Sequence, residues 1–133
     1  WGGLLSTAAS VRGVAGTIVD GSVRDADDSR DLNYPVFARA VVPLTARGRV
    51  SEHAWNEPIV VGGVDLKPGD LVIADGSGVV FIDANRSAEV LELAESIAAR
   101  EAKLTAAVRK GTPVSRVMDG SYESMLKQHR SSE

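Results

Sequence analysis

The sequence predicts an α/β fold, and three observations lead to this prediction. Two apolar stretches, residues 14–20 and 34–41, flank a short polar segment, which is the order strand, helix, strand. Several short apolar runs between residues 58 and 82 are separated by turns that contain Gly or Pro. Residues 86–110 then keep apolar side chains at helical spacing. A small β-rich region with helices before, within and after it is the expected architecture.

The first predicted element is a helix over residues 3–12, with apolar side chains at helical spacing and Gly13 as its stop. A strand over residues 14–20 follows. It contains few polar residues, which predicts that both of its faces are covered. We expect this strand to end in a turn at Asp20 and the glycine after it, with the aspartate side chain fixing that turn.

A short helix over residues 25–32 and a strand over residues 34–41 come next, with Pro35 at the start or edge of the strand. Since a helix connects two successive strands, parallel pairing is favoured. The following segment, residues 42–56, is polar and irregular and contains two arginines. We interpret it as a long functional or interfacial loop with a short strand near Arg49.

The next region is expected to be mostly antiparallel. Residues 58–64 read as a strand, and Pro68 with Gly69 predicts a turn. Residues 71–75 and 79–82 read as two strands of a hairpin, because three small residues, two of them glycine, separate them.

The last third is expected to be helical. A long helix over residues 86–110 begins near Asn85 or Ser87, either of which can cap it, and ends at Gly111. It can pack on the sheet of its own subunit or on a neighbour. A shorter amphipathic segment is predicted over residues 122–129.

The composition is that of an ordinary globular protein. The 133 residues suffice for a single domain, with 44% apolar and 25% charged side chains. The net charge of −3 argues against nucleic acid as a partner, because phosphate-binding proteins are usually basic. The absence of cysteine excludes disulfides, thiolate metal sites and cysteine nucleophiles.

No run approaches the roughly 20 apolar residues of a membrane span, and no secretory signal is present. We therefore expect a cytoplasmic enzyme or binding domain with no membrane partner.

The chain begins with Trp1 and passes directly into the first helix, without a preceding cap or strand. Such a beginning is typical of the middle of a fold. We therefore expect further sequence upstream, either removed by cleavage or carried on a separate N-terminal fragment.

Arg24 and Asp25 are the first candidate site residues, since they follow an apolar strand and the glycine-containing turn at its end. A guanidinium can bind a carboxylate or enolate oxygen in a forked manner, and a carboxylate can hold a hard divalent cation. The pair therefore indicates chemistry on a small anionic oxo-acid. A surface ion pair, or an Asp25 that caps the following helix, is the open alternative.

The start of the first helix is the second candidate, with Gly2, Leu4 and Leu5. Free amides and the helix dipole favour an anion there, although a plain helix start would look the same. Asp70 and Asp75 lie beside glycines, and we assign them to turns rather than to a metal.

Other catalytic classes have little support. His53, in the polar loop, is more readily a surface or interface residue than a base. Motifs of nucleotide-binding loops, zinc proteases and serine hydrolases do not occur in the sequence.

Taken together, these segments resemble the 4-hydroxy-4-methyl-2-oxoglutarate aldolase family, which shares its fold with the regulator of ribonuclease E activity A (RraA). The resemblance covers nearly the whole chain and is carried by glycines, by short apolar stretches and by charged residues in order. These are Gly2, Leu4, Leu5, Gly13, Gly16, Asp20, Gly21, Val23, Arg24, Asp25, residues 35–39, residues 62–64, residues 68–70, Ala74 and Asp75.

The resemblance implies an RraA-like αββα core of the swivelling β/β/α type with a long C-terminal helix. It implies a homotrimer or hexamer with active sites between subunits, and Mg or Mn held by Asp25 and water. It also implies that Arg24 binds the keto or enolate oxygen of the substrate. The amides of Leu4 and Leu5, beside Gly2, would bind the pyruvyl carboxylate. The reaction would be retro-aldol cleavage to pyruvate or decarboxylation of oxaloacetate, through an enolate.

One departure concerns Gly3. Catalytic members are expected to carry an aspartate twenty-one positions before the arginine, and that position is Gly3 in this chain. The regulator branch departs differently, because it lacks the aspartate that matches Asp25. The sequence therefore leaves three functions open: a lyase, a non-catalytic regulatory protein, or a diverged enzyme with another reaction.

Overall fold

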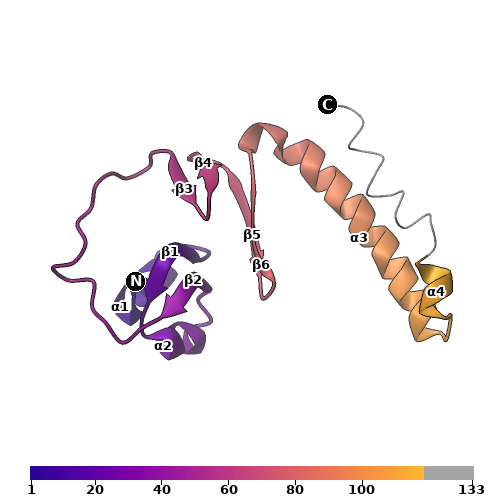
Figure 1. Cartoon of the computed structure of the whole chain (residues 1–133), viewed down its shortest axis with the longest axis horizontal. Coiled ribbons are helices and arrows are strands. Elements are labelled where there is room, and N and C mark those ends of the chain that lie inside the picture. The colour runs from indigo at the N-terminus through magenta and orange to yellow at the C-terminus, as the bar shows by residue number, and fades with distance from the viewer. Residues whose placement is uncertain (119–133) are drawn as a thin grey trace. The chain divides into compact units, whose positions relative to one another are not determined.

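The structure, a computed structural model, describes residues 1–118 and divides the chain into two compact units. The first unit is Trp1–Ala84 and the second begins at Asn85. Figure 1 shows helices and strands mixed in the first unit and a long helix, α3, in the second. The predicted α/β class and the long C-terminal helix are thus confirmed. The predicted segment over residues 122–129 lies outside the described residues.

The first unit begins with the predicted order of helix, strand, helix, strand. Helix α1 is Gly3–Val11, strand β1 is Thr17–Val23, helix α2 is Ala26–Asp31 and strand β2 is Val36–Val41. Strands β1 and β2 are parallel, as the connecting helix predicts, and lie side by side in Figure 1.

Gly13 ends α1 as predicted. Its φ of +72° is a left-handed conformation that glycine adopts at no steric cost. Its amide donates to the carbonyl of Ser10, and the amide of Val14 donates to that of Ala9. These two bonds satisfy carbonyls that the end of the helix leaves open.

The predicted turn at Asp20 is wrong, because β1 continues to Val23. The register against β2 shifts between Val19 and Ser22, so the chain passes Gly21 as an irregularity within the strand. The Asp20 carboxylate accepts hydrogen bonds from Arg39 on β2 and from the amide of Gly62, the latter at 2.8 Å. These partners, the guanidinium first, lower the pKa of Asp20. The Asp20 side chain therefore links β1 to β2 and to the Gly62 amide, and it does not fix a turn at residue 20.

The predicted strand over residues 58–64 is a hairpin. Strand β3 is Ile59–Val61 and strand β4 is Val64–Leu66, and the two pair antiparallel. Gly62 and Gly63 between them have φ of +61° and +84°. Positive φ at both central residues is what a tight hairpin turn of type I′ requires, so two glycines in a row reverse the chain.

The second hairpin agrees with its prediction. Strand β5 is Leu71–Asp75 and strand β6 is Gly78–Ile82, in antiparallel register. The turn before β5 also forms where predicted, with Gly69 at φ +98°.

The loop between β2 and β3 contains no strand near Arg49, contrary to the prediction. Instead, a turn forms in which the amide of Arg49 donates to the carbonyl of Ala46 at 2.9 Å. Gly48 has a φ of +74° within it. A strand here would need a neighbouring strand for its backbone groups, whereas this turn satisfies one of them locally.

The second unit contains helix α3, Ser87–Arg109, and the short helix α4, Val114–Val117. The N-cap residue of α3 is Arg86, which is the last residue of a 3₁₀ turn, η1, over Ala84–Arg86. The prediction that Asn85 or Ser87 caps this helix is therefore wrong. A 3₁₀ turn at the start lets the chain enter the helix without the extended conformation that a side-chain cap uses.

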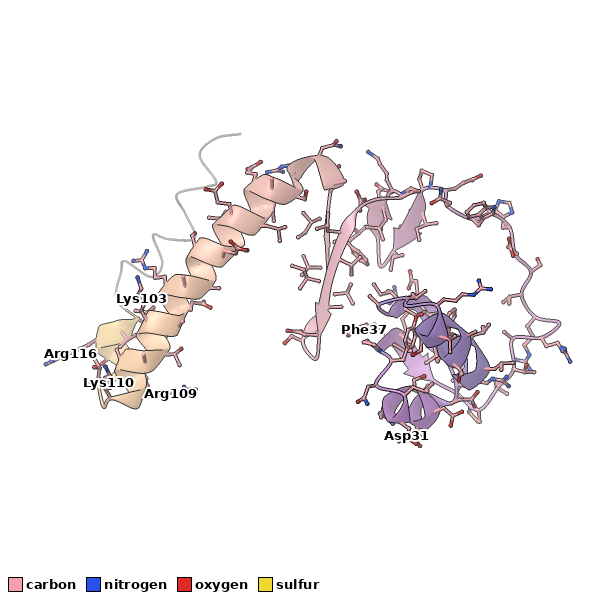
Figure 2. The ribbon with its side chains drawn as sticks, turned by 180° about the vertical axis from the view of Figure 1, so that it is seen from behind. Asp31, Phe37, Lys103, Arg109, Lys110 and Arg116 are labelled. Carbon is pink, nitrogen blue, oxygen red and sulfur yellow. The ribbon has the colours of Figure 1, made fainter. Side chains whose placement is uncertain are left out.

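Gly111 ends α3 as predicted, with a φ of +95°. Lys103, Arg109 and Lys110 lie toward this end of the helix, and Arg116 lies on α4 (Figure 2). Cations at the C-terminal end of a helix interact favourably with its dipole.

Burial among the described residues is concentrated near α1, β1 and α2. Ser6, Ala9, Val23 and Ser29 are buried there, whereas most of the large apolar side chains of the two hairpins are exposed and Ile82 on β6 is buried. Val60 on β3, for example, is 60% exposed. None of the helices within residues 1–118 combines the length and the apolar character that a membrane crossing requires.

Candidate functional site

The start of α1 lies directly against the start of α2. The amide of Gly3 donates to Oδ2 of Asp25 at 3.0 Å. The amide of Arg24 donates to the carbonyl of Trp1 at 3.1 Å. The structure therefore brings the two sequence-predicted groups of site residues together, although about twenty residues separate them in the chain.

A buried pair of hydroxyls fixes this junction. Ser6 on α1 and Ser29 on α2 have their Oγ atoms 2.9 Å apart, and Ser6 is fully buried. The Trp1 indole donates to the Ser6 hydroxyl at 2.9 Å. Since a buried polar group that loses its partner is costly, this network holds the two helix starts in one arrangement.

Arg24 and Asp25 form a partly exposed ion pair. Nε of Arg24 lies 3.4 Å from Oδ2 of Asp25, and their side chains are 44% and 40% exposed. Asp25 occupies the N-cap position of α2 with a φ of +54°, yet its side chain makes no capping bond to that helix. The capping alternative is therefore wrong, because the carboxylate binds the start of α1 instead. Asp and Asn are the residues that tolerate this backbone region best.

Gly2 permits the close approach between these parts. A Cβ placed on Gly2 would lie 2.8 Å from Oδ2 of Asp25 and 2.9 Å from Nε of Arg24. Any side chain there would displace the ion pair. Glycine at position 2 thus leaves room for the ion pair in this position.

Gly3 faces another carboxylate. A Cβ placed on Gly3 would overlap the carboxylate of Asp28 on α2. The space that an acidic side chain at position 3 would enter is thus taken by an acidic side chain from position 28.

Two backbone amides are open at the start of α1. The amide of Ser6 donates to the carbonyl of Gly2 at 3.0 Å, and that of Gly3 donates to Asp25. In the described part of the chain, the amides of Leu4 and Leu5 make no hydrogen bond. These are the two amides expected to bind a carboxylate.

A cavity of about 690 Å³, called here the arginine cavity, opens at this place. Its lining includes four of the predicted site residues and two arginines from the loop after β2: Gly2, Leu4, Leu5, Arg24, Arg47 and Arg49. No acidic residue within the described range lines it. Asp25 does not line the cavity but lies next to it through its contact with Arg24.

Sequence reasoning did not single out Arg47 and Arg49 as site residues. The available signal was two arginines on either side of Gly48 in a loop that was interpreted as functional or interfacial. The two arginines alone did not indicate which other segment of the chain the loop contacts.

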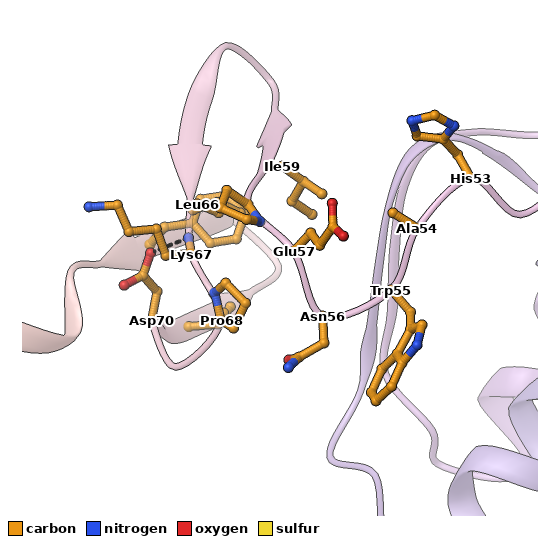
Figure 3. A pocket seen from close by; sticks show the side chains of 13 residues that line it. His53, Ala54, Trp55, Asn56, Glu57, Ile59, Leu66, Lys67, Pro68 and Asp70 are labelled. Atoms are coloured by element: carbon orange, nitrogen blue, oxygen red, sulfur yellow. Dashed lines mark hydrogen bonds between the residues drawn. The ribbon is translucent and has the colours of Figure 1, made fainter.

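A second cavity of about 690 Å³, called here the His53 cavity, is lined by His53, Glu57, Lys67 and Asp70 among others. Figure 3 shows the side chains that line it. The Asp70 carboxylate accepts bonds from the amides of Lys67, at 2.8 Å, and Ala84, at 3.1 Å. These bonds, that from Lys67 first, lower the pKa of Asp70.

The turn roles predicted for the two aspartates are confirmed. Asp70 serves the turn that contains Gly69, and Asp75 accepts a bond from the amide of Ser77 at 2.7 Å in the β5–β6 turn.

Asp25 could contribute one ligand atom to a divalent cation. Its Oδ2 is engaged with Gly3 and Arg24, whereas its Oδ1 makes no hydrogen bond in the part of the chain that the structure describes. Within those residues, no three acidic or histidine side chains gather in a way that could hold a metal. One open carboxylate oxygen supplemented by water is compatible with Mg²⁺, which usually keeps several waters.

Residues 1–81 match a family model described as "RraA-like: Aldolase/RraA". A protein of Halalkalibacterium halodurans named "Putative 4-hydroxy-4-methyl-2-oxoglutarate aldolase" is 38% identical over 87 residues, or 65% of this chain and 41% of that protein.

Two solved structures share the fold, which confirms the RraA-like expectation. An uncharacterized protein from Pseudomonas syringae pv. tomato matches with a TM-score of 0.85 and 32% identity, over 90% of this chain and 60% of that one. Streptomyces coelicolor RraAS2, described as an unusual member of the RNase ES inhibitor RraA protein family, matches with a TM-score of 0.64 and 35% identity. That match covers 71% of this chain and 48% of the other. The chain spans between 18% and 57% of the length of the first curated relatives that it matches.

Proposed function

The chain belongs to the RraA-like family, and from that premise we propose that it is a divalent-metal-dependent lyase of pyruvyl oxo-acids. The reactions are retro-aldol cleavage of a substrate similar to 4-hydroxy-4-methyl-2-oxoglutarate and decarboxylation of oxaloacetate. The observation that carries the proposal is the arginine cavity, in which Arg24 meets the two open amides of α1. The relative in Halalkalibacterium halodurans supports it by its name.

In this proposal each group has a distinct part. The amides of Leu4 and Leu5 bind the pyruvyl carboxylate beside Gly2, where a side chain would intrude. The guanidinium of Arg24 binds the keto oxygen and favours the enolate, because its positive charge meets the negative charge that develops there. Nε of Arg24 is turned to Asp25, which leaves its terminal nitrogens for this forked contact.

We assign the divalent cation, Mg or Mn, to Asp25, which would hold it through its open oxygen together with water. When bound, such a cation supplies further positive charge to the developing enolate. The bond from the Gly3 amide fixes the orientation of the carboxylate.

Asp28 is our candidate for the acid that the family keeps at position 3. It lies against Gly3 but does not line the arginine cavity, so it would reach the substrate through a water molecule. In a retro-aldol cleavage, a base takes the proton of the hydroxyl group while the neighbouring carbon–carbon bond breaks and its electron pair forms the enolate. Decarboxylation releases CO₂ and forms the same enolate without removing a hydroxyl proton. Asp28→Asn should therefore impair the retro-aldol reaction more than the decarboxylation.

The test is titration calorimetry with Mn²⁺ and oxalate, which mimics the pyruvate enolate, followed by pyruvate release from both substrates. We expect oxalate binding that depends on the metal. Asp25→Asn keeps the volume and an oxygen acceptor for the Gly3 amide but removes the charge. We expect it to lose metal-dependent turnover by about 100-fold or more, as the loss of a group that stabilises transition-state charge does. Unchanged metal-dependent turnover in this variant would refute the assignment.

A non-catalytic regulatory protein is the second candidate, favoured by Gly3 and by the likeness to Streptomyces coelicolor RraAS2. A regulator would bind a protein partner and show neither oxalate binding nor pyruvate release with any metal. We further propose a homotrimer or hexamer, which native mass spectrometry of the purified protein can test. The same spectrum would show whether an N-terminal fragment co-purifies.

A further inference from the structure

The buried hydroxyls of Ser6 and Ser29 belong to a chain of hydrogen bonds that begins at Trp1. An indole N–H can only donate, so the Ser6 hydroxyl accepts the bond from Trp1 at 2.9 Å. The proton of the Ser6 hydroxyl is shared between Ser29, 2.9 Å away, and the carbonyl of Gly2, at 3.3 Å. The Ser29 hydroxyl donates to the carbonyl of Asp25 at 3.5 Å. In this order each group donates one proton, and the chain ends on the backbone of Asp25.

Asp25 has a backbone conformation that depends on support from its surroundings. Its φ of +54° and ψ of +44° are left-handed, which a residue other than glycine keeps only where neighbouring contacts fix it. Its carbonyl accepts the amide of Ser29 at 3.3 Å as well as the Ser29 hydroxyl. Its carboxylate accepts the amide of Gly3 at 3.0 Å. The chain from Trp1 therefore acts on the backbone that directs this carboxylate.

Trp1 makes a second contact at the same place, through its own backbone. Its carbonyl accepts the amide of Arg24 at 3.1 Å, and the half-buried residue lines the arginine cavity. One residue thus holds the backbone on both sides of the bond between Arg24 and Asp25, directly through its carbonyl and indirectly through the two serines. Because its indole N–H is committed to Ser6, the indole does not serve as a donor to the substrate.

We propose that Trp1 is a positioning residue for the carboxylate of Asp25 and that it acts through Ser6 and Ser29. This inference rests on the proposed function, in which that carboxylate holds the divalent cation. A metal ligand that is held in one orientation loses less freedom when the cation binds. The removal of a group that orients a metal ligand typically lowers metal affinity or activity by about 10- to 100-fold.

The test uses Trp1→Phe, which keeps an aromatic ring but removes the indole N–H. Without metal, we expect the amide hydrogen of Gly3 to exchange with solvent faster than in the wild type, as measured by NMR, because the carboxylate that protects it is held less firmly. In calorimetry with oxalate present, the affinity for Mn²⁺ should fall by about 10-fold or more. Ser29→Ala interrupts the same chain at another point and should change both quantities in the same direction.

The control is Tyr34→Phe, which breaks a comparable hydroxyl pair away from the site. The buried Tyr34 has its hydroxyl 2.7 Å from Oγ1 of Thr17, at the beginning of β1, whereas Arg24 follows the end of that strand. This variant should keep the wild-type exchange at Gly3 and the wild-type affinity for Mn²⁺.

Wild-type Mn²⁺ affinity in Trp1→Phe and Ser29→Ala, or an equal loss in Tyr34→Phe, would overturn the positioning role. Absence of metal-dependent oxalate binding in the wild type would instead count against the proposed function. The exchange of the Gly3 amide would then still decide whether Trp1 holds Asp25, so the two failures are distinguishable.

Discussion

The arginine cavity and the His53 cavity each have a volume of about 690 Å³, but they differ in the charges of the residues that line them. In the His53 cavity, His53, Glu57, Lys67 and Asp70 mix both signs of charge, and the Asp70 carboxylate is committed to two backbone amides. In the arginine cavity, the charged residues of the described lining are all arginines, and two backbone amides next to them remain open.

Cavity size alone does not identify a functional site in this protein. What distinguishes the arginine cavity is that the charged residues of its described lining are all cations and lie beside two backbone amides that the fold does not use. A histidine, a glutamate and a lysine line the His53 cavity, but Asp70 in the same cavity serves a turn. Free donors of one charge sign are the stronger indication of an anion site.

The largest effect on activity is expected from a substitution of Arg24 in the arginine cavity. Arg24→Lys should lower kcat/KM for pyruvate release by about 100-fold, because a point charge does not reproduce the forked contact of a guanidinium. His53→Ala in the other cavity should leave kcat/KM within about twofold, the small effect expected of a surface substitution. Steady-state kinetics with oxaloacetate measures both. Equal losses in the two variants would abolish the distinction between the cavities.

A smaller effect concerns the hydroxyl pair beneath the arginine cavity. Ser29→Ala should lower the free energy of unfolding by about 1–3 kcal/mol, because it leaves the fully buried Ser6 hydroxyl without one of its partners. Urea unfolding measures this difference. The Ser6→Ala/Ser29→Ala variant should cost less than the sum of the two single changes, whereas strict additivity would show that the pair does not couple α1 to α2.

The smallest effect on stability is expected from a substitution of Asp70, which lines the His53 cavity. Asp70→Asn should lower the thermal midpoint at neutral pH, since the two amides stabilise the charged carboxylate and lower its pKa. A lowered pKa contributes stability that is fully present above the ordinary carboxyl value of about 3.9 and is lost as the pH falls through the folded-state pKa. The difference between wild type and variant should therefore shrink below about pH 4. Metal-dependent oxalate binding by this variant should match the wild type, and a loss would show that the His53 cavity takes part in ligand binding.

Much of the local structure was predictable because its causes are local. Helical spacing and Gly13 predicted α1 and its end, and the small residues at 76–78 predicted the β5–β6 hairpin. Predictions failed where a segment depends on a partner: Asp20 binds Arg39 and the Gly62 amide rather than its own turn. The consecutive glycines at 62 and 63 were a local signal of a turn, but the surrounding valines were interpreted as one strand.

The sequence by itself determined the α/β class, the family resemblance and the choice of Arg24, Asp25 and the start of α1 as candidate residues. Only the tertiary structure decided that the Asp25 carboxylate binds the Gly3 amide, that Asp28 takes the space beside Gly3, and that Arg47 and Arg49 line the same cavity as Arg24. The physical reason is the distance along the chain over which each interaction acts. Helix spacing and glycine conformation act over a few neighbouring residues, whereas contacts between segments about twenty residues apart depend on how α1, α2 and the loop after β2 pack.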